Sequence, residues 1–227
     1  MKIQEERMSK RSKAIIDLSV SVIYVMVAVF AIVMFNNYIL MSLPLAVRMI
    51  AMLFSQWCVM IVPLILMKVR GEKLSGLGFT KERLMEQILT GIILALVLSL
   101  ILTVLPVLTM GKENIVGSHY QYLWQFIFDF IHKLGFVALM EEIIFRGYIY
   151  YKLLEIKSYK WLAILVSSLL FGLMHIFTGG IVQVIMTAVI GVILCLFREK
   201  ISKCTILSLV IAHGLYDWLI GVWGYVF

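Results

Sequence analysis

The chain has 227 residues, of which 63% are hydrophobic and 15% charged, and its mean hydropathy is +1.03. Soluble domains contain about 45–50% apolar residues, so this composition excludes an ordinary soluble globular protein. The formal net charge of +7 could suit nucleic-acid binding. However, the basic residues fall in short clusters between apolar segments, as membrane-orientation signals do. We therefore expect an integral membrane protein in contact with the lipid bilayer and without a nucleic-acid partner.

The N-terminal segment MKIQEERMSKRSK is basic and precedes a long apolar run. That run is longer than the hydrophobic region of a signal peptide, and no A-x-A-like cleavage site follows it. We interpret residues 1–13 as a cytoplasmic tail and residues 14–227 as a single integral-membrane domain.

Spanning a bilayer takes about 20 predominantly apolar residues. Seven segments meet this requirement: 14–35, 49–67, 88–109, 134–156, 161–178, 181–197 and 205–226. The aromatic and partly charged stretch 121–133 could lie at the membrane interface, extend the fourth helix or form an eighth span. The predicted fold class is all-α, a polytopic transmembrane helical bundle of about seven spans, with eight as the alternative.

The loop charges predict an orientation. All but three of the 20 Lys and Arg residues fall on the same side of a seven-span chain. The exceptions are Arg48, Lys112 and Lys133. By the positive-inside rule, the N-terminus lies in the cytoplasm and the C-terminus outside.

The cysteines and one glycine pair have structural interpretations. Cys58, Cys195 and Cys204 show no CxxC pairing, so they predict neither a disulfide framework nor a zinc knuckle. We expect them to be small packing residues. The Gly179–Gly180 pair predicts a tight turn between the fifth and sixth spans.

Two histidines and one charge pair are expected at the membrane surface. His119 and His132 lie outside the predicted spans and are interpreted as solvated or interfacial. Asp129 and Lys133 are four residues apart, so they are expected to form a surface ion pair.

Three of the predicted spans contain ionisable residues, which are costly within a bilayer and indicate functional sites. These residues are Glu141, Glu142 and Arg146 in the fourth span, His175 in the fifth, and His213 and Asp217 in the seventh. A Glu–Arg pair or one histidine could simply hold two helices together. Two histidines and three carboxylates in three spans are difficult to explain by packing, so together they predict a functional site.

Helix geometry sorts these residues into faces. Glu142 and Arg146 are four residues apart and can pair, and His213 and Asp217 share a face for the same reason. Glu141 is rotated by about 100° from Glu142, so it can point to a different neighbour.

The fifth and seventh spans also carry signals for close packing. Phe171 and His175 share a helix face, while Gly172 and Gly214 allow neighbouring helices to approach closely. If the carboxylates are to reach the depth of the histidines, the fourth helix must run well past its charged residues, towards Leu154.

The three polar motifs are EExxxR at 141–146, FxxxH at 171–175 and HxxxD at 213–217. Together, and in this order on separate apolar spans, they resemble the family of CAAX prenyl proteases and bacteriocin-processing membrane proteins, called the ABI or CPBP family. The resemblance covers about residues 134–220. Position 217 is Asp where the best-known members have Asn, and an ionised Asp can only accept hydrogen bonds. Asp217 therefore either stays protonated or orients His213.

The resemblance implies an intramembrane endopeptidase, in a bacterial cell membrane, that hydrolyses a membrane-associated peptide or protein. By position in the motifs, it implies Glu141 as the general base that activates water, with His175 helping to hold that water. It implies His213 and Asp217 as the groups that polarise the scissile carbonyl and stabilise the oxyanion. The residues implied to support this geometry are Glu142, Arg146 and Phe171. A carboxylate in a low-dielectric site is a better base near neutral pH, which agrees with these roles.

Alternative hypotheses remain for both the cofactor and the function. Zinc could be held by Glu141, His175 and His213 with an open fourth position, but no HExxH motif is present. We favour a mechanism without a metal or another cofactor. A non-enzymatic bacteriocin-immunity or scaffold protein could use the same polar cavity. A proton- or metal-coupled transporter is a third hypothesis, although the sequence shows no repeated half with matching broken helices.

Overall fold

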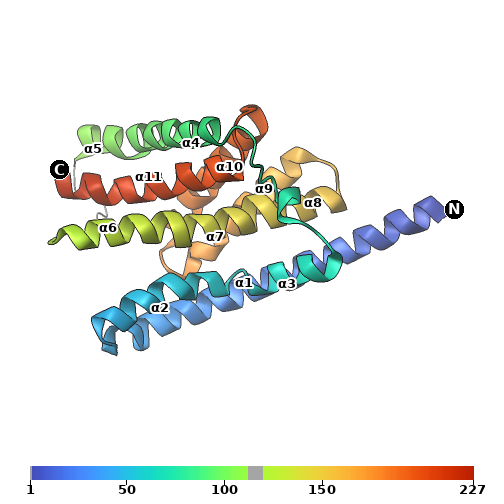
Figure 1. Ribbon diagram of the computed structural model, residues 1–227, viewed down its shortest axis with the longest axis horizontal. Helices are drawn as coiled ribbons and strands as arrows, with labels where there is room; N and C mark the ends of the chain where they lie inside the picture. The colour runs from blue at the N-terminus through green and yellow to red at the C-terminus, as the bar shows by residue number, and fades with distance from the viewer. Residues whose placement is uncertain (1, 112–119) are drawn as a thin grey trace.

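The structure is a computed structural model that describes residues 2–111 and 120–227 (Figure 1). Within these ranges the chain forms helices and no strand. Seven helical segments of the described chain are long and apolar enough to cross a membrane, which confirms the predicted all-α transmembrane bundle. The segments are Ser9–Ser42, Leu45–Arg70, Leu84–Met110, Leu123–Ile156, Lys160–Phe177, Ile181–Lys200 and Ile206–Val226.

The first three spans form the N-terminal half. Their elements are the helices α1 (Lys2–Tyr38), η1 (Leu40–Ser42), α2 (Leu45–Cys58), α3 (Ile61–Arg70), η2 (Leu74–Leu77), α4 (Leu84–Ser99), η3 (Leu100–Val104) and α5 (Leu105–Met110). Because α1 already begins at Lys2, the basic N-terminal segment continues directly into the first span. The second span is interrupted between α2 and α3, just before Pro63, whose ring has no N–H to donate to a helix.

The last four spans form the C-terminal half. Their elements are α6 (Leu123–His132), η5 (Lys133–Ala138), α7 (Leu139–Glu142), η6 (Ile143–Ile149), α8 (Tyr150–Ile156), α9 (Lys160–Met174), η7 (His175–Phe177), α10 (Ile181–Lys200) and α11 (Ile206–Val226). The segments η5 and η6 are π-helical, and the elements from α6 to α8 follow one another without a break. The stretch 121–133 therefore extends the fourth helix, which also runs past its charged residues as expected.

This longer fourth helix corrects two expectations about its first turns. His132 lies within the span, is half-buried and stacks on Phe128 with ring centroids 5.9 Å apart, so it is not a solvated histidine. Asp129 accepts a hydrogen bond of 2.5 Å from the hydroxyl of Tyr120 instead of pairing with Lys133, which lines an internal pocket. The second predicted interfacial histidine, His119, lies outside the described residues.

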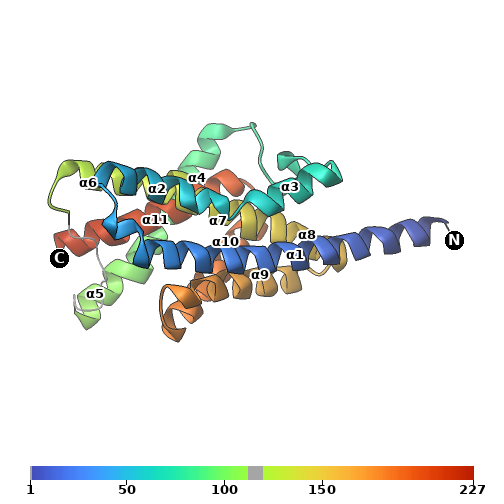
Figure 2. The same cartoon turned by 90° about the horizontal axis from the view of Figure 1, so that it is seen from below.

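The helices pack closely where glycines remove side-chain bulk. Figures 1 and 2 show α11 alongside α4 and the fourth helix, with α9 beside α10. A Cβ atom at Gly214 would lie 2.7 Å from the Cα atom of Leu134, and one at Gly172 would lie 2.5 Å from the carbonyl oxygen of Val184. Both glycines therefore permit the close helix approach that the sequence predicts.

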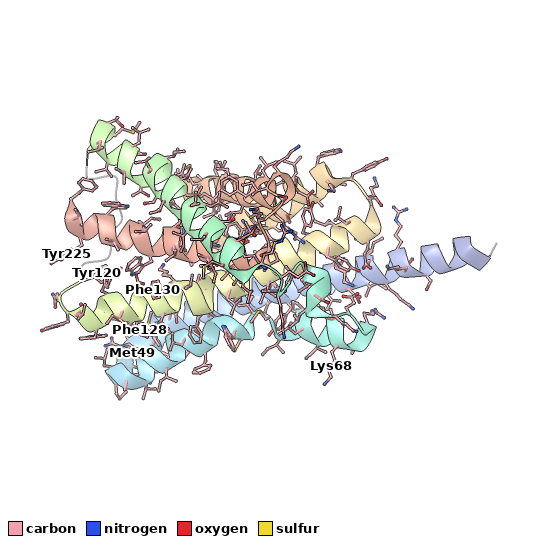
Figure 3. All side chains as sticks on the ribbon, turned by 45° about the horizontal axis from the view of Figure 1, so that its top comes forward. Met49, Lys68, Tyr120, Phe128, Phe130 and Tyr225 are labelled. Carbon is pink, nitrogen blue, oxygen red and sulfur yellow. The ribbon has the colours of Figure 1, made fainter. Side chains whose placement is uncertain are left out.

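Large apolar side chains are exposed on at least five of the seven spans. They include Ile23 on α1, Phe54 on α2, Ile93 on α4, Leu169 on α9 and Ile185 on α10. Figure 3 shows the side chains of the described residues on the ribbon. Exposed apolar side chains on this many helices are suited to contact with lipid rather than water.

A buried ion network joins three helices near the N-terminal end. The Asp17 carboxylate on α1 accepts two hydrogen bonds, of 2.8 and 2.7 Å, from the guanidinium of Arg70 at the end of α3. The buried ammonium of Lys152 on α8 pairs with Glu72 and, at 3.3 Å, with Glu155. The two buried charges, Asp17 and Lys152, lie 3.6 Å apart and connect the two sets of contacts, so each buried charge is compensated.

The cysteines and the glycine pair behave largely as predicted. All three cysteines are free, and Cys195 and Cys204 are buried packing residues, but Cys58 is exposed, so its packing interpretation is wrong. Burial raises the pKa of the Cys204 thiol to about 12. Gly179 and Gly180 form the expected turn between η7 and α10.

Candidate active site

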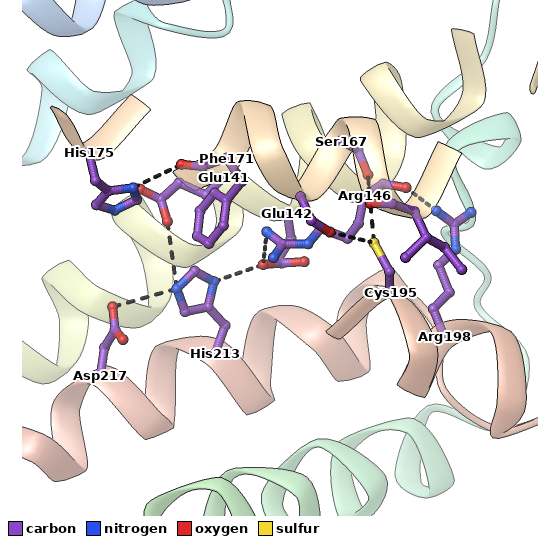
Figure 4. Close-up of polar contacts among 12 residues, drawn as sticks. Glu141, Glu142, Arg146, Ser167, Phe171, His175, Cys195, Arg198, His213 and Asp217 are labelled. Carbon is purple, nitrogen blue, oxygen red and sulfur yellow. Dashed lines mark hydrogen bonds and ion pairs between the residues drawn. The ribbon is translucent and has the colours of Figure 1, made fainter. Parts of the chain in front are cut away.

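The structure brings all seven residues of the three motifs together inside the bundle (Figure 4). Two come from α7, one from η6, two from the end of the fifth span and two from α11. They are Glu141, Glu142, Arg146, Phe171, His175, His213 and Asp217.

The imidazole ring of His213 is the centre of the cluster. Its Nδ1 atom lies 2.7 Å from Oε1 of Glu142 and donates a hydrogen bond to it, because a carboxylate accepts. Its Nε2 atom lies 3.6 Å from Oε2 of Glu141 and 3.6 Å from Oδ2 of Asp217. Although Glu141 could point to a different neighbour, both glutamates reach the same ring at opposite nitrogens. Glu142, not Asp217, holds the Nδ1 atom.

Glu142 and Arg146 form the predicted ion pair. The guanidinium Nη1 atom donates to Oε1 of Glu142 at 2.9 Å, and both side chains are 0% exposed. The same carboxylate oxygen therefore accepts from Arg146 and from His213. The Cζ atom of Arg146 lies 4.1 Å from the centre of the Phe171 ring, a cation–π distance. This pair fixes the position of Glu142 and, through it, the orientation of His213.

Phe171 connects both histidines to the arginine. Nδ1 of His175 lies 3.0 Å from the Phe171 carbonyl oxygen and must donate to it, because a carbonyl can only accept. The second ring nitrogen of His175 is then the available acceptor when the ring is neutral. The Phe171 ring meets His175 and His213 edge-on, with centroid distances of 5.1 and 5.8 Å. Phe171 thus positions the two imidazole rings on either side of itself.

Irregular helix geometry places the two glutamates. The short helix α7 carries both of them and lies between the π-helical segments η5 and η6. A π-helical turn is wider than an α-helical turn, and such turns are frequent at functional sites. Arg198 on α10 supports this region, because it donates hydrogen bonds to the carbonyl oxygens of Arg146 and, at 3.1 Å, of Leu77.

A cavity of about 420 Å³ lies beside the cluster. Its acidic and imidazole lining consists of Glu141, His175, His213 and Asp217. A cavity of this size can accommodate a small-molecule ligand or a short peptide segment. Since Glu141 and Asp217 reach the cavity while Glu142 is enclosed, the two adjacent glutamates have different access to water and substrate.

Besides Tyr216, three polar residues of the cavity are missing from the sequence-based site. They are Lys133 in the fourth span and Gln183 and Thr187 in the sixth span. The sequence carries a signal for each. A lysine in an apolar stretch suggests a polar surrounding, and Gln183 and Thr187 are four residues apart, on one helix face.

The described side chains do not form a metal site. No group of three or more His, Cys, Asp and Glu residues in the described chain is arranged to hold a metal ion. No step of the mechanism below is therefore routed through a metal.

The comparison with protein families agrees with these motifs. Residues 122–219 match the family described as type II CAAX prenyl endopeptidase Rce1-like. This match covers less than half of the chain. Neither the curated proteins nor the solved structures gave a match. The matched segment includes all three motifs, and because it starts at residue 122 it also contains the aromatic beginning of the fourth helix and Lys133. At the family level, the Rce1-like match supports a membrane-embedded endopeptidase.

Proposed function

We propose that this Rce1-like protein is an intramembrane endopeptidase that hydrolyses a membrane-associated peptide and uses Glu141 as its general base. The observation that carries this proposal is the position of Glu141. Its carboxylate lines the cavity and lies 3.6 Å from Nε2 of His213, while the adjacent Glu142 holds the opposite nitrogen of the same ring. A base, an orienting carboxylate and an imidazole are thereby aligned beside a space for substrate.

In the proposed reaction, Glu141 takes a proton from a water molecule in the cavity. The resulting hydroxide attacks the scissile carbonyl carbon, and the carbonyl oxygen becomes an oxyanion. Glu141 then gives its proton to the leaving nitrogen, the carbon–nitrogen bond breaks, and a carboxylic acid and an amine are released. General acid–base catalysis of this kind typically contributes about 10²–10⁴-fold in rate.

His213 is proposed to stabilise the oxyanion. Three carboxylates lie around its ring, at 2.7 Å from Nδ1 and at 3.6 Å from Nε2. The negative charges of Glu141 and Glu142 on opposite sides of the ring favour its doubly protonated form, whose Nε2–H group can donate to an oxyanion. Removing one donor of this kind typically costs about 10²–10³-fold in rate.

His175 and Asp217 are proposed to contact the reacting groups from the two sides of the cavity. His175 would hold the attacking water through its free Nε2 atom, since its Nδ1 atom is engaged by the Phe171 carbonyl. Asp217 would act on the oxyanion side, next to Nε2 of His213. Because Glu142 already orients His213, we propose that Asp217 acts in its protonated form, as a hydrogen-bond donor.

The proposed setting is a cell membrane, with the N-terminus in the cytoplasm. The two termini lie at opposite ends of the bundle in Figures 1 and 2, as an odd number of spans requires. The loops α3–α4, α8–α9 and α10–α11 lie at the N-terminal end and carry most of the loop Lys and Arg residues. The positive-inside rule supports a cytoplasmic location for that end.

The proposed activity can be tested with purified protein in lipid vesicles. The substrates are a farnesylated peptide whose modified cysteine is fourth from the C-terminus, and the same peptide without the farnesyl group. We expect wild-type protein to cleave at least one of them, which also shows whether the prenyl group is required. We expect Glu141→Gln and His213→Ala to lower cleavage at least 10²-fold. Glu86→Gln, an exposed carboxylate paired with Lys203, is the matched control.

Two outcomes would contradict the proposal. Cleavage that persists in Glu141→Gln would remove the general base from the mechanism. A biological activity, such as immunity to a bacteriocin, that persists in folded Glu141→Gln and His213→Ala would favour the binding or scaffold function. For zinc, loss of turnover on adding a chelator, with recovery on adding zinc, would contradict the metal-free mechanism.

A further inference from the structure

We propose that Lys133 binds the free C-terminal carboxylate of the substrate and thereby selects a peptide bond a few residues from the chain end. This inference rests on the proposed peptidase function and assigns a specificity-determining residue to it. Lys133 lines the same cavity as Glu141, His213 and Asp217. Of the described residues that line this cavity, Lys133 is the one lysine, and no arginine is among them.

The position of Lys133 calls for an anionic partner. It lies ten residues after the start of the fourth span, where an ammonium is costly unless it faces a polar cavity or a partner. Its side chain is half-buried, and within the described chain it forms no ion pair at 4.0 Å or less. The acidic neighbours that face the cavity are already placed around His213. An ammonium in this setting is suited to bind a carboxylate that arrives with the ligand.

The spacing between Lys133 and Glu141 along the fourth helix sets the number of residues between the scissile bond and the C-terminus of the substrate. Lys133 precedes Glu141 by eight positions, which corresponds to about 12 Å along an α-helix and less where the helix is π-helical. An extended peptide covers about 3.3 Å per residue, so three residues cover about 10 Å. A substrate whose scissile bond lies at Glu141 and whose last carboxylate lies at Lys133 therefore loses about two to four residues.

Two further polar side chains of the cavity can hold such a peptide in an extended form. Gln183 and Thr187 on α10 line the cavity with Lys133 and offer side-chain amide and hydroxyl groups. These groups can bond to the backbone of any sequence, whereas an ammonium selects the terminal carboxylate by its charge.

Binding measurements test Lys133 without requiring turnover. The protein is the Glu141→Gln variant in lipid nanodiscs, which keeps the cavity but lacks the proposed base. The probes are the farnesylated peptide as a free acid, the same peptide as a C-terminal amide, and the free acid lengthened by six residues. We expect the free acid to bind about tenfold or more tightly than the other two, because a charge-assisted hydrogen bond is lost in the amide and misplaced in the longer peptide.

Substitutions at Lys133 should change this selectivity and not binding in general. In the Glu141→Gln background, Lys133→Gln should weaken binding of the free acid to the level of the amide and leave the amide unchanged. Lys133→Arg should retain most of the selectivity. Lys68→Gln, an exposed lysine at the end of α3, is the matched control and should change neither affinity.

The outcomes separate the role of Lys133 from the peptidase function. Equal binding of acid and amide, including no binding of either, overturns the assignment. Equal weakening of both peptides by Lys133→Gln also overturns it, because Lys133 would then only neutralise the acidic side chains of the cavity. If wild-type protein cleaves acid and amide equally fast, the peptidase function stands and the role of Lys133 is refuted. If no cleavage depends on Glu141 but the acid still binds selectively, the peptidase function fails and the carboxylate site stands.

Discussion

Arg146, Glu142 and His213 form a buried series of side-chain contacts. Substitutions of Glu142 and Arg146 should therefore change the free energy of unfolding in a non-additive way. Glu142→Gln removes one negative charge while keeping the size of the side chain. The amide oxygen can still accept from His213, but the guanidinium of Arg146 loses the one carboxylate that pairs with it among the described residues. Both Glu142 and Arg146 are 0% exposed, so water cannot replace the lost partner at their surfaces.

The magnitude follows from this burial. Breaking a buried ion pair on one side costs about 3–5 kcal/mol, because the remaining charge is uncompensated. We therefore expect Glu142→Gln to lower the free energy of unfolding by about 3–5 kcal/mol. Adding Arg146→Met removes the uncompensated charge and keeps an unbranched chain against Phe171. The double variant should therefore be more stable than Glu142→Gln alone, although it carries one more substitution.

Denaturant titration in detergent micelles, followed by circular dichroism, measures these differences. The exposed pair Glu86–Lys203 provides the control, since its side chains are 40% and 54% exposed. An exposed pair contributes about 0–1 kcal/mol, so Glu86→Gln should change the free energy of unfolding by no more than that. The electrostatic reasoning is refuted if Glu142→Gln costs less than about 1 kcal/mol, or if the costs of Glu142→Gln and Arg146→Met simply add in the double variant.

Three further predictions concern other parts of the bundle. Asp217→Asn should retain most peptidase activity, because the amide supplies a donor where a protonated Asp217 would, while Asp217→Ala should lower kcat at least tenfold. Gly214→Leu should prevent stable folding, seen as loss of a monodisperse peak in size-exclusion chromatography, because its Cβ would lie 2.7 Å from the Cα atom of Leu134. Cys204 should resist maleimide labelling at pH 8, because a thiol pKa of about 12 leaves about one thiolate in 10⁴. Labelling of Cys204 should rise only as the pH approaches 12, and rapid labelling at pH 8 would refute its burial.

The number and order of the spans could be predicted from the sequence because each span depends mainly on its own composition. A segment of about 20 apolar residues must form a helix in lipid to satisfy its backbone hydrogen bonds, whatever its neighbours are. The start of the fourth span was less predictable. Its first turns contain Asp129, His132 and Lys133, which lower the apolar content although the segment is helical.

The members of the site were predictable, but their connections were not. The i, i+4 rule correctly paired Glu142 with Arg146, since both lie on one helix. The same rule placed Glu141 and Glu142 on different faces and suggested different partners. In the structure, α11 brings His213 between them, so that both faces meet one ring. The position of α11 depends on packing between helices, such as the approach of Gly214 to Leu134, and helix periodicity does not contain that information.

The two adjacent glutamates can serve different purposes because only one of them is compensated. Glu142 shares one oxygen with Arg146 and His213, so its negative charge is balanced and its position is fixed. Within 4.0 Å, the ion-pair contact of Glu141 among the described residues is with Nε2 of His213, and its carboxylate borders the cavity. A carboxylate without an arginine partner gains more from taking up a proton than one that has such a partner. The arginine thus distinguishes a positioning glutamate from a glutamate that can accept a proton from water, although the two are neighbours in the chain.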